Sequence, residues 1–322
     1  MTSDATASSV PDLEKDREDA ARLKRSQTTR VVSARVSLPE RLKEIWNCRE
    51  LLKNLISTEI KVKYKGSFLG ILWSMVAPAI TLLIFWFVFG IVLRNGVPNY
   101  VIFLFSGLLF WNFFQLGVQT STGIIVARAG IVKKIAFPRE ILGLACVGTA
   151  GVFLFFQSIV MIIFMVVLGA APDWPMIPIL ILSLIAVTLI GSALGILLSA
   201  VNVYLRDMQH LIEVILTAWF WACPIVYSYW ASIQPHIHTQ WIKFVYLLNP
   251  MTPVVMTSQR VIYAHPVVNL TTGTHPVMNI LPPWGAGSYV LMNLILIGAG
   301  IIFMAIALIV FGRLEGNFAE EL

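Results

Sequence analysis

Long apolar runs separated by short polar segments dominate this chain from about residue 67 to residue 312. Six of the runs have about 20 mostly apolar residues or more, the length of helix that crosses the hydrocarbon core of a bilayer. They cover residues 67–93, 100–126, 141–168, 176–204, 211–230 and 285–312, and Pro78 predicts a kink in the first. The pattern predicts an all-α integral membrane protein with six transmembrane helices.

The composition supports a multi-pass membrane protein. Only 12% of the residues are charged and 57% are hydrophobic, whereas soluble domains have about 25% charged residues. The net charge of +6 does not indicate nucleic-acid binding, because the basic residues flank the apolar runs as orientation signals do. The six-span topology places 20 of the 23 Lys and Arg residues on the side of the N-terminus. We therefore expect a cytoplasmic (inner) membrane protein with both termini in the cytoplasm.

The N-terminal part divides into two segments before the membrane domain of residues 66–312. Residues 1–36 contain few large apolar side chains, so we expect a disordered cytoplasmic extension. Residues 37–65 begin with a capping box, Ser37 to Glu40, and predict an amphipathic helix lying at the membrane interface. The alternative is a helix packed on a soluble domain, which the sequence does not contain. The apolar stripe of this predicted amphipathic helix consists of Leu42, Ile45, Trp46, Leu52, Ile56 and Ile60.

Three lysines, Lys61, Lys63 and Lys65, stand directly before the first span. Each contributes about 1 kcal/mol near anionic head groups, which fits an anchor of the positive-inside type. The alternative is contact with the acidic head group of a lipid-linked substrate. After the last span, residues 313–322 are expected to form a short cytoplasmic tail.

The segment between the fifth and sixth spans is apolar at residues 241–263 but is interrupted by Pro250 and Pro253. Each half is too short to cross, so we expect two short re-entrant helices between spans five and six. Four histidines lie nearby without carboxylates or cysteines, and we expect no metal site; they are His236, His238, His265 and His275. Small residues recur in spans three and four and predict close helix packing within one bundle; they are Gly143, Gly151, Gly191, Gly195 and Ser199.

A short basic segment, residues 127–140, separates spans two and three. We call it the elbow. Its sequence, ARAGIVKKIAFPRE, places it on the cytoplasmic side and leaves an amphipathic surface that a soluble partner could push. The alternative is a loop that sets the topology and contacts nothing. The chain has no GxxxxGK[ST] phosphate loop, and no carboxylate or histidine pair lies deep in the spans. Neither an internal ATPase nor a proton-coupled carrier is therefore indicated.

Four segments resemble, in the right order, the type-2 ABC exporter permeases of the polysaccharide class. They are residues 50–80, the elbow sequence GIVKKIAFPRE, VNVYLRDMQHLIE at 201–213 and LLNPMTPVV at 247–255. The resemblance covers about residues 42–312, and the long N-terminal extension departs from the shorter members. It implies a non-enzymatic half-transporter: a homodimer that forms the pore, with two separate ABC ATPase subunits that bind ATP and Mg²⁺. Such permeases export lipid-linked polysaccharides such as O-antigen, capsule, teichoic acid or mycobacterial-type galactan.

The resemblance assigns ATPase coupling to the elbow and to the loop before span five. Ile131 and Phe137 are the expected apolar anchors, Lys133, Lys134 and Arg139 steer the partner, and Pro138 ends the short coupling helix. Glu140, Arg206 and Asp207 complete the expected coupling residues.

Aromatic side chains provide flat faces that stack on sugar rings. The expected channel residues are Trp73, Trp219, Trp221, Tyr227 and Tyr229, although an interfacial aromatic belt explains Tyr227 and Tyr229 equally well. The rival functions are a drug or small-lipid exporter of the same fold, a membrane-embedded glycan-modifying enzyme, and a passive channel.

Overall fold

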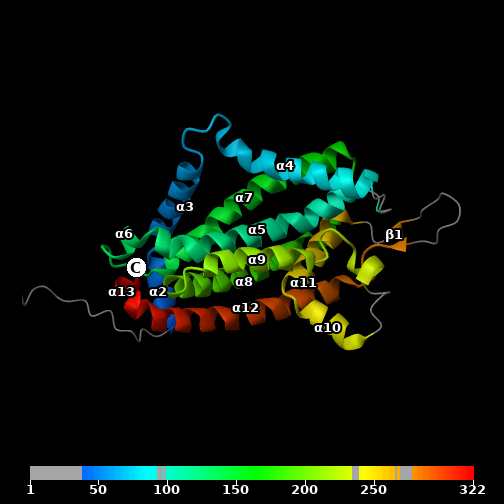
Figure 1. Cartoon of the computed structure of the whole chain (residues 1–322). Helices are drawn as coiled ribbons and strands as arrows, with labels where there is room; N and C mark the ends of the chain where they lie inside the picture. The colour runs from blue at the N-terminus through cyan, green and yellow to red at the C-terminus, as the bar shows by residue number, and fades with distance from the viewer. Residues whose placement is uncertain (1–37, 93–96, 98, 234–238, 265–266, 269–277) are drawn as a thin grey trace, which may run out of the picture. The chain divides into compact units, whose positions relative to one another are not determined.

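The computed structural model describes residues 38–92, 97, 99–233, 239–264, 267–268 and 278–322, all within the unit Val36–Leu322. Its central helix is α5 (Tyr100–Ala127), most of whose side chains are buried. A helix that is apolar on every side is stable only when other helices surround it. Helices α7 (Glu140–Val167) and α8 (Ile177–Tyr204) pack on α5, and α12 (Ala286–Leu314) packs along α8 (Figure 1).

Five helical segments in the described part of the chain are long and apolar enough to cross a membrane. They are Gly70–Phe89, Tyr100–Ala127, Glu140–Val167, Trp174–Tyr204 and Ala286–Asn317. These segments match the first, second, third, fourth and sixth expected spans to within a few residues. The first combines η1 (Gly70–Leu72), α4 (Trp73–Phe85) and part of η2 (Trp86–Val92), and Pro78 lies inside α4. The fourth begins with η3 (Trp174–Met176). The protein is thus a multi-pass membrane protein whose spanning segments are all helical.

The expected fifth span, residues 211–230, differs from the structure. Helix α9 covers Met208–Trp221 and has 14 residues, a length of about 21 Å, which is short of the roughly 30 Å hydrocarbon core. Pro224 explains the early end, because the residue before a proline is disfavoured in the helical conformation. The chain then turns and forms η4 (Tyr229–Ile233).

Small residues bring α5, α7 and α8 close together, as the sequence predicts. A side-chain carbon added at Gly195 would lie 2.8 Å from Cβ of Ser121, and one at Gly143 would lie 3.5 Å from the side chain of Ile196. The hydroxyl of Ser121 donates to the carbonyl of Gly143 at 3.0 Å. The predicted packing of these glycines within one bundle is confirmed.

The segment before the first span forms two helices, α2 (Leu38–Asn47) and α3 (Arg49–Lys63), separated at Cys48. Ile45, Leu52, Ile56 and Ile60 are partly buried, in agreement with the predicted stripe. Leu42 and Trp46 are exposed instead. The expected extension 1–36 and Ser37 of the capping box lie outside the described residues.

The last residues fold back onto the bundle. Helix α12 is followed by η6 (Glu315–Asn317) and α13 (Phe318–Glu321), and the ring of Phe318 is buried against Tyr204 and Phe311. Helices α2, α6 (Ala129–Val132) and α13 lie at the same end of the bundle (Figure 1). We call this the elbow end.

Two short helices, α10 (Gln240–Leu248) and α11 (Met251–Ser258), lie at the opposite end of the bundle (Figure 1). The break falls at Asn249 and Pro250, as the sequence predicts. Every residue of α11 is buried, and hydrogen bonds from Asn293 to Thr257 (3.0 Å) and from Ser183 to Asn293 (2.9 Å) tie it to α12 and α8. After η5 (Gln259–Tyr263), strands β1 (Val267–Val268) and β2 (Met278–Asn279) pair antiparallel. The four histidines considered as metal ligands lie outside the described residues.

Candidate functional site

The elbow joins α5 to α7 through a single short helix. Helix α6 has only four residues, and the chain from Lys133 to Arg139 is not helical. The prediction that Pro138 ends this helix is wrong, because the helix already ends at Val132. Pro138 instead precedes α7, and its carbonyl accepts a hydrogen bond from the backbone N–H of Ile141 at 3.2 Å. A proline is tolerated there, because it stands before the N-cap Arg139 and its missing N–H removes no hydrogen bond from the helix.

The elbow offers both charge and apolar surface to a partner. Lys133 and Lys134 are exposed, as expected. Ile135 is 58% exposed, whereas Ile131 is partly buried and Phe137 packs against the core at the elbow end. Sequence reasoning missed Ile135, whose side chain is more exposed than those of Ile131 and Phe137. The order of apolar and basic residues in this short segment does not show which of its apolar side chains face the bundle.

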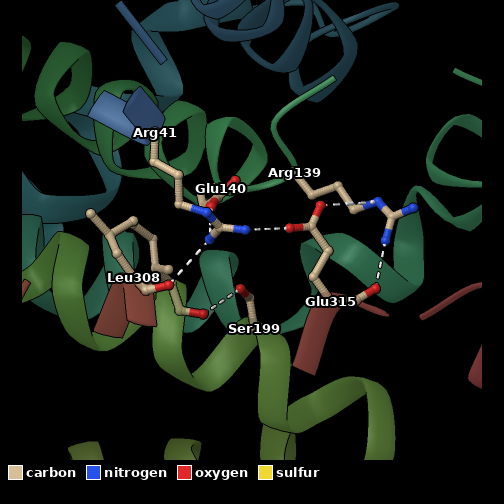
Figure 2. A network of polar contacts seen from close by, with 7 residues as sticks. Arg41, Arg139, Glu140, Ser199, Leu308 and Glu315 are labelled. Atoms are coloured by element: carbon tan, nitrogen blue, oxygen red, sulfur yellow. Dashed lines mark hydrogen bonds and ion pairs between the residues drawn. The ribbon is translucent and has the colours of Figure 1, made fainter. Parts of the chain in front are cut away.

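The two charged residues at the end of the elbow turn inward. Arg41 of α2 donates to Glu140 at 2.5 Å and to Glu315 at 2.9 Å, and it also donates to the carbonyl of Leu308 at 3.1 Å (Figure 2). Arg139 donates to the backbone carbonyl of Glu315 at 2.9 Å. Its Nε lies 3.6 Å from the Glu315 carboxylate. We call these four residues, Arg41, Arg139, Glu140 and Glu315, the elbow cluster.

The elbow cluster contains two positive and two negative charges and joins α2, the start of α7 and η6. Arg139 also lies over the Phe318 ring, with its guanidinium carbon 5.7 Å from the ring centre. Arg139 and Glu140 therefore fix the base of the elbow and are not part of its free surface. Sequence reasoning missed Arg41 and Glu315. One feature of the sequence could have indicated a buried partner for Arg41. It lies four residues before the apolar Ile45, on the same side of α2, where an arginine needs a partner.

A second contact ties α3 to the end of α5. Arg128 donates to Glu59 at 2.5 Å, with both side chains about 29% exposed. The expected head-group lysines lie at and after the end of α3. Lys61 and Lys65 are exposed, and the ammonium of Lys63 lies 4.4 Å from the centre of the Phe153 ring. Burial lowers the pKa of Lys63 from its ordinary value. Lys63 thus packs on α7 although, like Lys61 and Lys65, it is exposed.

The structure separates the five expected channel aromatics. Trp73 and Trp221 are exposed, but Tyr229 is buried and stacks on Tyr246, with ring centres 5.4 Å apart. Tyr229 therefore cannot line a channel from within this chain. Tyr227 donates to the carbonyl of Trp221 at 2.8 Å.

The indole N–H of Trp219 donates to Asn249 at 2.8 Å, which fixes the junction of α10 and α11 onto α9. Trp219, which was expected to line the channel, therefore holds α9 and the α10–α11 junction together. Arg206 and Asp207, the remaining expected coupling residues, are exposed in the turn between α8 and α9.

Together these features define a multi-pass helical membrane protein with a charged, internally braced elbow at one end. Residues 50–263 match the family model described as ABC-2 type transporter, which is more than half of the chain. The chain therefore belongs to the ABC-2 type transporter family and is a transport subunit, not an enzyme.

Two relatives extend this comparison. The O-antigen export system permease protein RfbA of Myxococcus xanthus is 32% identical over 226 residues, covering 70% of this chain and 84% of that protein. A Klebsiella pneumoniae protein of the same name is 28% identical over 275 residues, covering 85% of this chain and 95% of its own length.

Proposed function

We propose that this chain is the permease subunit of an ABC transporter that exports a lipid-linked polysaccharide across the cytoplasmic membrane. One observation carries the proposal: the similarity to O-antigen export permeases extends over 84–95% of those proteins. These relatives favour a polysaccharide over a drug or a small lipid as the cargo.

The elbow is the proposed docking surface for the ATPase subunit. Lys133 and Lys134 would steer an acidic cleft of the partner, and Ile135 would insert as the apolar anchor beside Ile131. The elbow cluster supports this role, because a push on the elbow reaches α7, α2 and η6 through charged contacts of 2.5–2.9 Å. Arg206 and Asp207 are exposed at the start of α9 and complete the proposed surface. ATP and Mg²⁺ would bind to the partner.

The proposed topology places the elbow end in the cytoplasm together with both termini. Helix α9 leaves the elbow end, α10 and α11 lie at the other end, and α12 returns (Figure 1). We propose that α9 and the mostly buried segment 222–230 together make the fifth of six crossings, with α10 and α11 as a re-entrant pair before α12. The buried hydrogen bonds of α11 support this, because backbone that is not part of a spanning helix is tolerated at membrane depth only where protein surrounds it.

A second copy of the chain and lipid would cover the outward apolar surfaces. The most apolar window of the first span is only 6% buried within the chain, so the exposed side of α4, including Trp73, needs an apolar partner. Helices α2 and α3 would lie at the cytoplasmic interface, where Lys61 and Lys65 meet the anionic head group of the lipid carrier. The exposed ring of Trp221 is the best-placed of the expected channel aromatics.

Charge reversal at the elbow tests the docking. Lys133→Glu combined with Lys134→Glu should abolish co-purification of the ATPase subunit and reduce surface glycan by at least tenfold. Lys243→Glu, on α10 at the opposite end, is the control and should change neither. Full recovery of the ATPase with unchanged export would refute the docking surface.

Depletion of the protein tests the transport function itself. A lipid-linked glycan should accumulate in the inner leaflet while the cell surface loses that glycan. If the surface glycan persists after depletion, the proposed function is wrong.

A further inference from the structure

Two neighbouring backbone carbonyls at the end of α12 accept hydrogen bonds from two different parts of the elbow end. The phenol of Tyr204, the last residue of α8, donates to the carbonyl of Leu314 at 2.7 Å. The guanidinium of Arg139, at the base of the elbow, donates to the carbonyl of Glu315 at 2.9 Å. The last carbonyls of a helix have no partner within it, so they can accept such donors. The end of α12 thus binds the elbow and the end of α8 at once.

The aromatic ring of Phe318 lies where the same three elements meet. It is fully buried, and its centre is 6.2 Å from the ring centre of Tyr204 and 5.6 Å from that of Phe311. The guanidinium carbon of Arg139 lies 5.7 Å from the same ring. A cation is attracted to the face of an aromatic ring, and the attraction is stronger where water is excluded. Phe318 therefore contacts α8, α12 and the base of the elbow with one side chain.

The local structure holds Phe318 in this position. Helix α12 is followed directly by η6 and α13, and the backbone N–H of Phe318 donates to the carbonyl of Glu315. One carboxylate oxygen of Glu315 accepts from Arg41 at 2.9 Å, and the other lies 3.6 Å from Nε of Arg139 (Figure 2). We call residues 314–318 the tie segment. Backbone, charged and apolar contacts all fix it.

The tie segment joins the two loops that we propose as contacts of the ATPase subunit. The elbow exposes Lys133 and Lys134, and the turn 205–207 after α8 exposes Arg206 and Asp207. In the part of the chain that the structure describes, no hydrogen bond or ion pair runs directly from the elbow to this turn. The two loops are instead hydrogen-bonded to a common partner, the tie segment.

The membrane crossing itself does not need the residues beyond α12. This helix has 29 residues and is about 44 Å long, already longer than the hydrocarbon core of about 30 Å. Residues 315–318 come after the crossing is complete, and the ring contacts of Phe318 are all with residues at the elbow end. The role of these residues therefore lies at the elbow end.

We propose that the tie segment couples the elbow to the turn 205–207, so that a push of the ATPase subunit on one loop moves both loops as one body. This proposal rests on the proposed export function. Phe318 is a positioning residue, because its ring is buried within this chain and acts through Tyr204 and Arg139. Loss of the link leaves the ATPase subunit bound and active but lowers the amount of glycan exported per ATP hydrolysed.

The first test removes one hydrogen bond of the link and keeps the aromatic ring. Tyr204→Phe should lower the glycan exported per ATP hydrolysed about threefold, the effect of one neutral hydrogen bond. The ATPase subunit should still co-purify in the normal amount. Sugar analysis of the cell surface measures export, and the complex purified from the same cells gives the rate of ATP hydrolysis.

Tyr100→Phe is the matched control for this test. The phenol of Tyr100 also donates to a backbone carbonyl at 2.7 Å, that of Val226, but at the opposite end of the bundle. This variant should keep the ratio of glycan to ATP of the unmodified protein. An unchanged ratio in Tyr204→Phe, or an equal loss in Tyr100→Phe, overturns the proposal.

The second test asks whether both loops act through the same segment. Arg139→Gln removes the bond to the Glu315 carbonyl and should lower the ratio of glycan to ATP by about threefold or more, without loss of the ATPase subunit. Because breaking either contact already separates the loops, Tyr204→Phe combined with Arg139→Gln should be no worse than the more harmful single variant. Losses that multiply would mean that each loop acts alone, which contradicts the proposal.

The third test removes the central ring. Phe318→Ala should lower the ratio of glycan to ATP by about fivefold or more. Phe105→Ala removes a ring that is equally buried, near the other end of α5, and is the control. Both variants should lower the thermal stability of the complex, but only Phe318→Ala should lower the ratio. Equal ratios in the two variants refute the role of Phe318, and if Phe318→Ala cannot be purified, the Tyr204→Phe result decides.

These results separate the proposal from the proposed function. If Tyr204→Phe keeps the normal ratio while depletion of the protein still abolishes surface glycan, only the tie segment is wrong. If depletion leaves the surface glycan in place, the export function itself fails.

Discussion

Replacing Arg41 by methionine tests the elbow cluster most directly. The change keeps much of the length of the side chain but removes the guanidinium that contacts Glu140, Glu315 and the Leu308 carbonyl. Arg139 still lies 3.6 Å from Glu315, so that carboxylate keeps a positive neighbour. Glu140, whose side chain is only 2% exposed, loses its ion-pair partner.

The expected magnitude follows from this burial. Breaking a buried ion pair by removing one partner costs about 3–5 kcal/mol, mostly because an uncompensated charge stays buried. The side chains of Arg41 and Glu315 are 13% and 14% exposed, so we expect the lower end, about 3 kcal/mol. Adding Glu140→Gln to the Arg41→Met variant should recover about 1–2 kcal/mol, because a neutral amide costs less to bury than a carboxylate.

Thermal unfolding of the purified complex in detergent measures these differences, and ATPase activity per exported glycan measures coupling. Lys53→Met is the matched control. Lys53 pairs with Glu50 at 3.0 Å with both side chains about 70% exposed, so its loss should cost less than about 1 kcal/mol. If Arg41→Met is no more harmful than Lys53→Met, or if Glu140→Gln makes it worse, the reasoning on the elbow cluster is refuted.

Two further predictions concern helix packing. Gly148→Ala should destabilise the contact of α3 with α7 by at most about 1 kcal/mol, because the new carbon would stand 2.4 Å from Cδ1 of Ile56, the end of a side chain that can rotate away; Ile56→Val should relieve it, as thermal unfolding of the double variant can show. Asn293→Leu should cost about 1–2 kcal/mol by leaving Thr257 and Ser183 without their shared partner, and protease sensitivity at α11 should rise.

Each packing prediction has a clear contrary result. An Ile56→Val change that fails to restore stability would mean that α3 does not cross α7 at Gly148. Unchanged protection of α11 in the Asn293→Leu variant would mean that apolar packing alone holds this helix.

The sequence located the long helices well because their signal is local. The starts and ends of α5, α7, α8 and α12 lie within one or two residues of the predicted spans. Each is a continuous apolar run, and transfer to the membrane interior depends on composition over about 20 residues. The break between α10 and α11 was equally local, because Pro250 marks it, although Pro253, which was also expected to interrupt the segment, lies inside α11.

The fifth crossing and the elbow were harder to predict. Apolar composition over residues 211–230 does not show where a helix stops, and Pro224 ended α9 before the apolar run did. At the elbow, the sequence supplied five charged residues but not their directions. Lys133 and Lys134 face outward, whereas Arg139 and Glu140 turn inward, because each finds a partner on the distant η6 or α2.

The sequence by itself determined that this is a multi-pass helical membrane protein with a basic elbow and no visible motor, because those properties add up along the chain. Only the tertiary structure decided which charges pair and which distant side chains come together. Arg41 meets Glu140 and Glu315 across 99 and 274 positions, and Gln209 lies against Gly123 only where α9 folds onto α5. Such contacts depend on how helices pack, and packing distances of a few ångströms are not encoded in any single stretch of sequence.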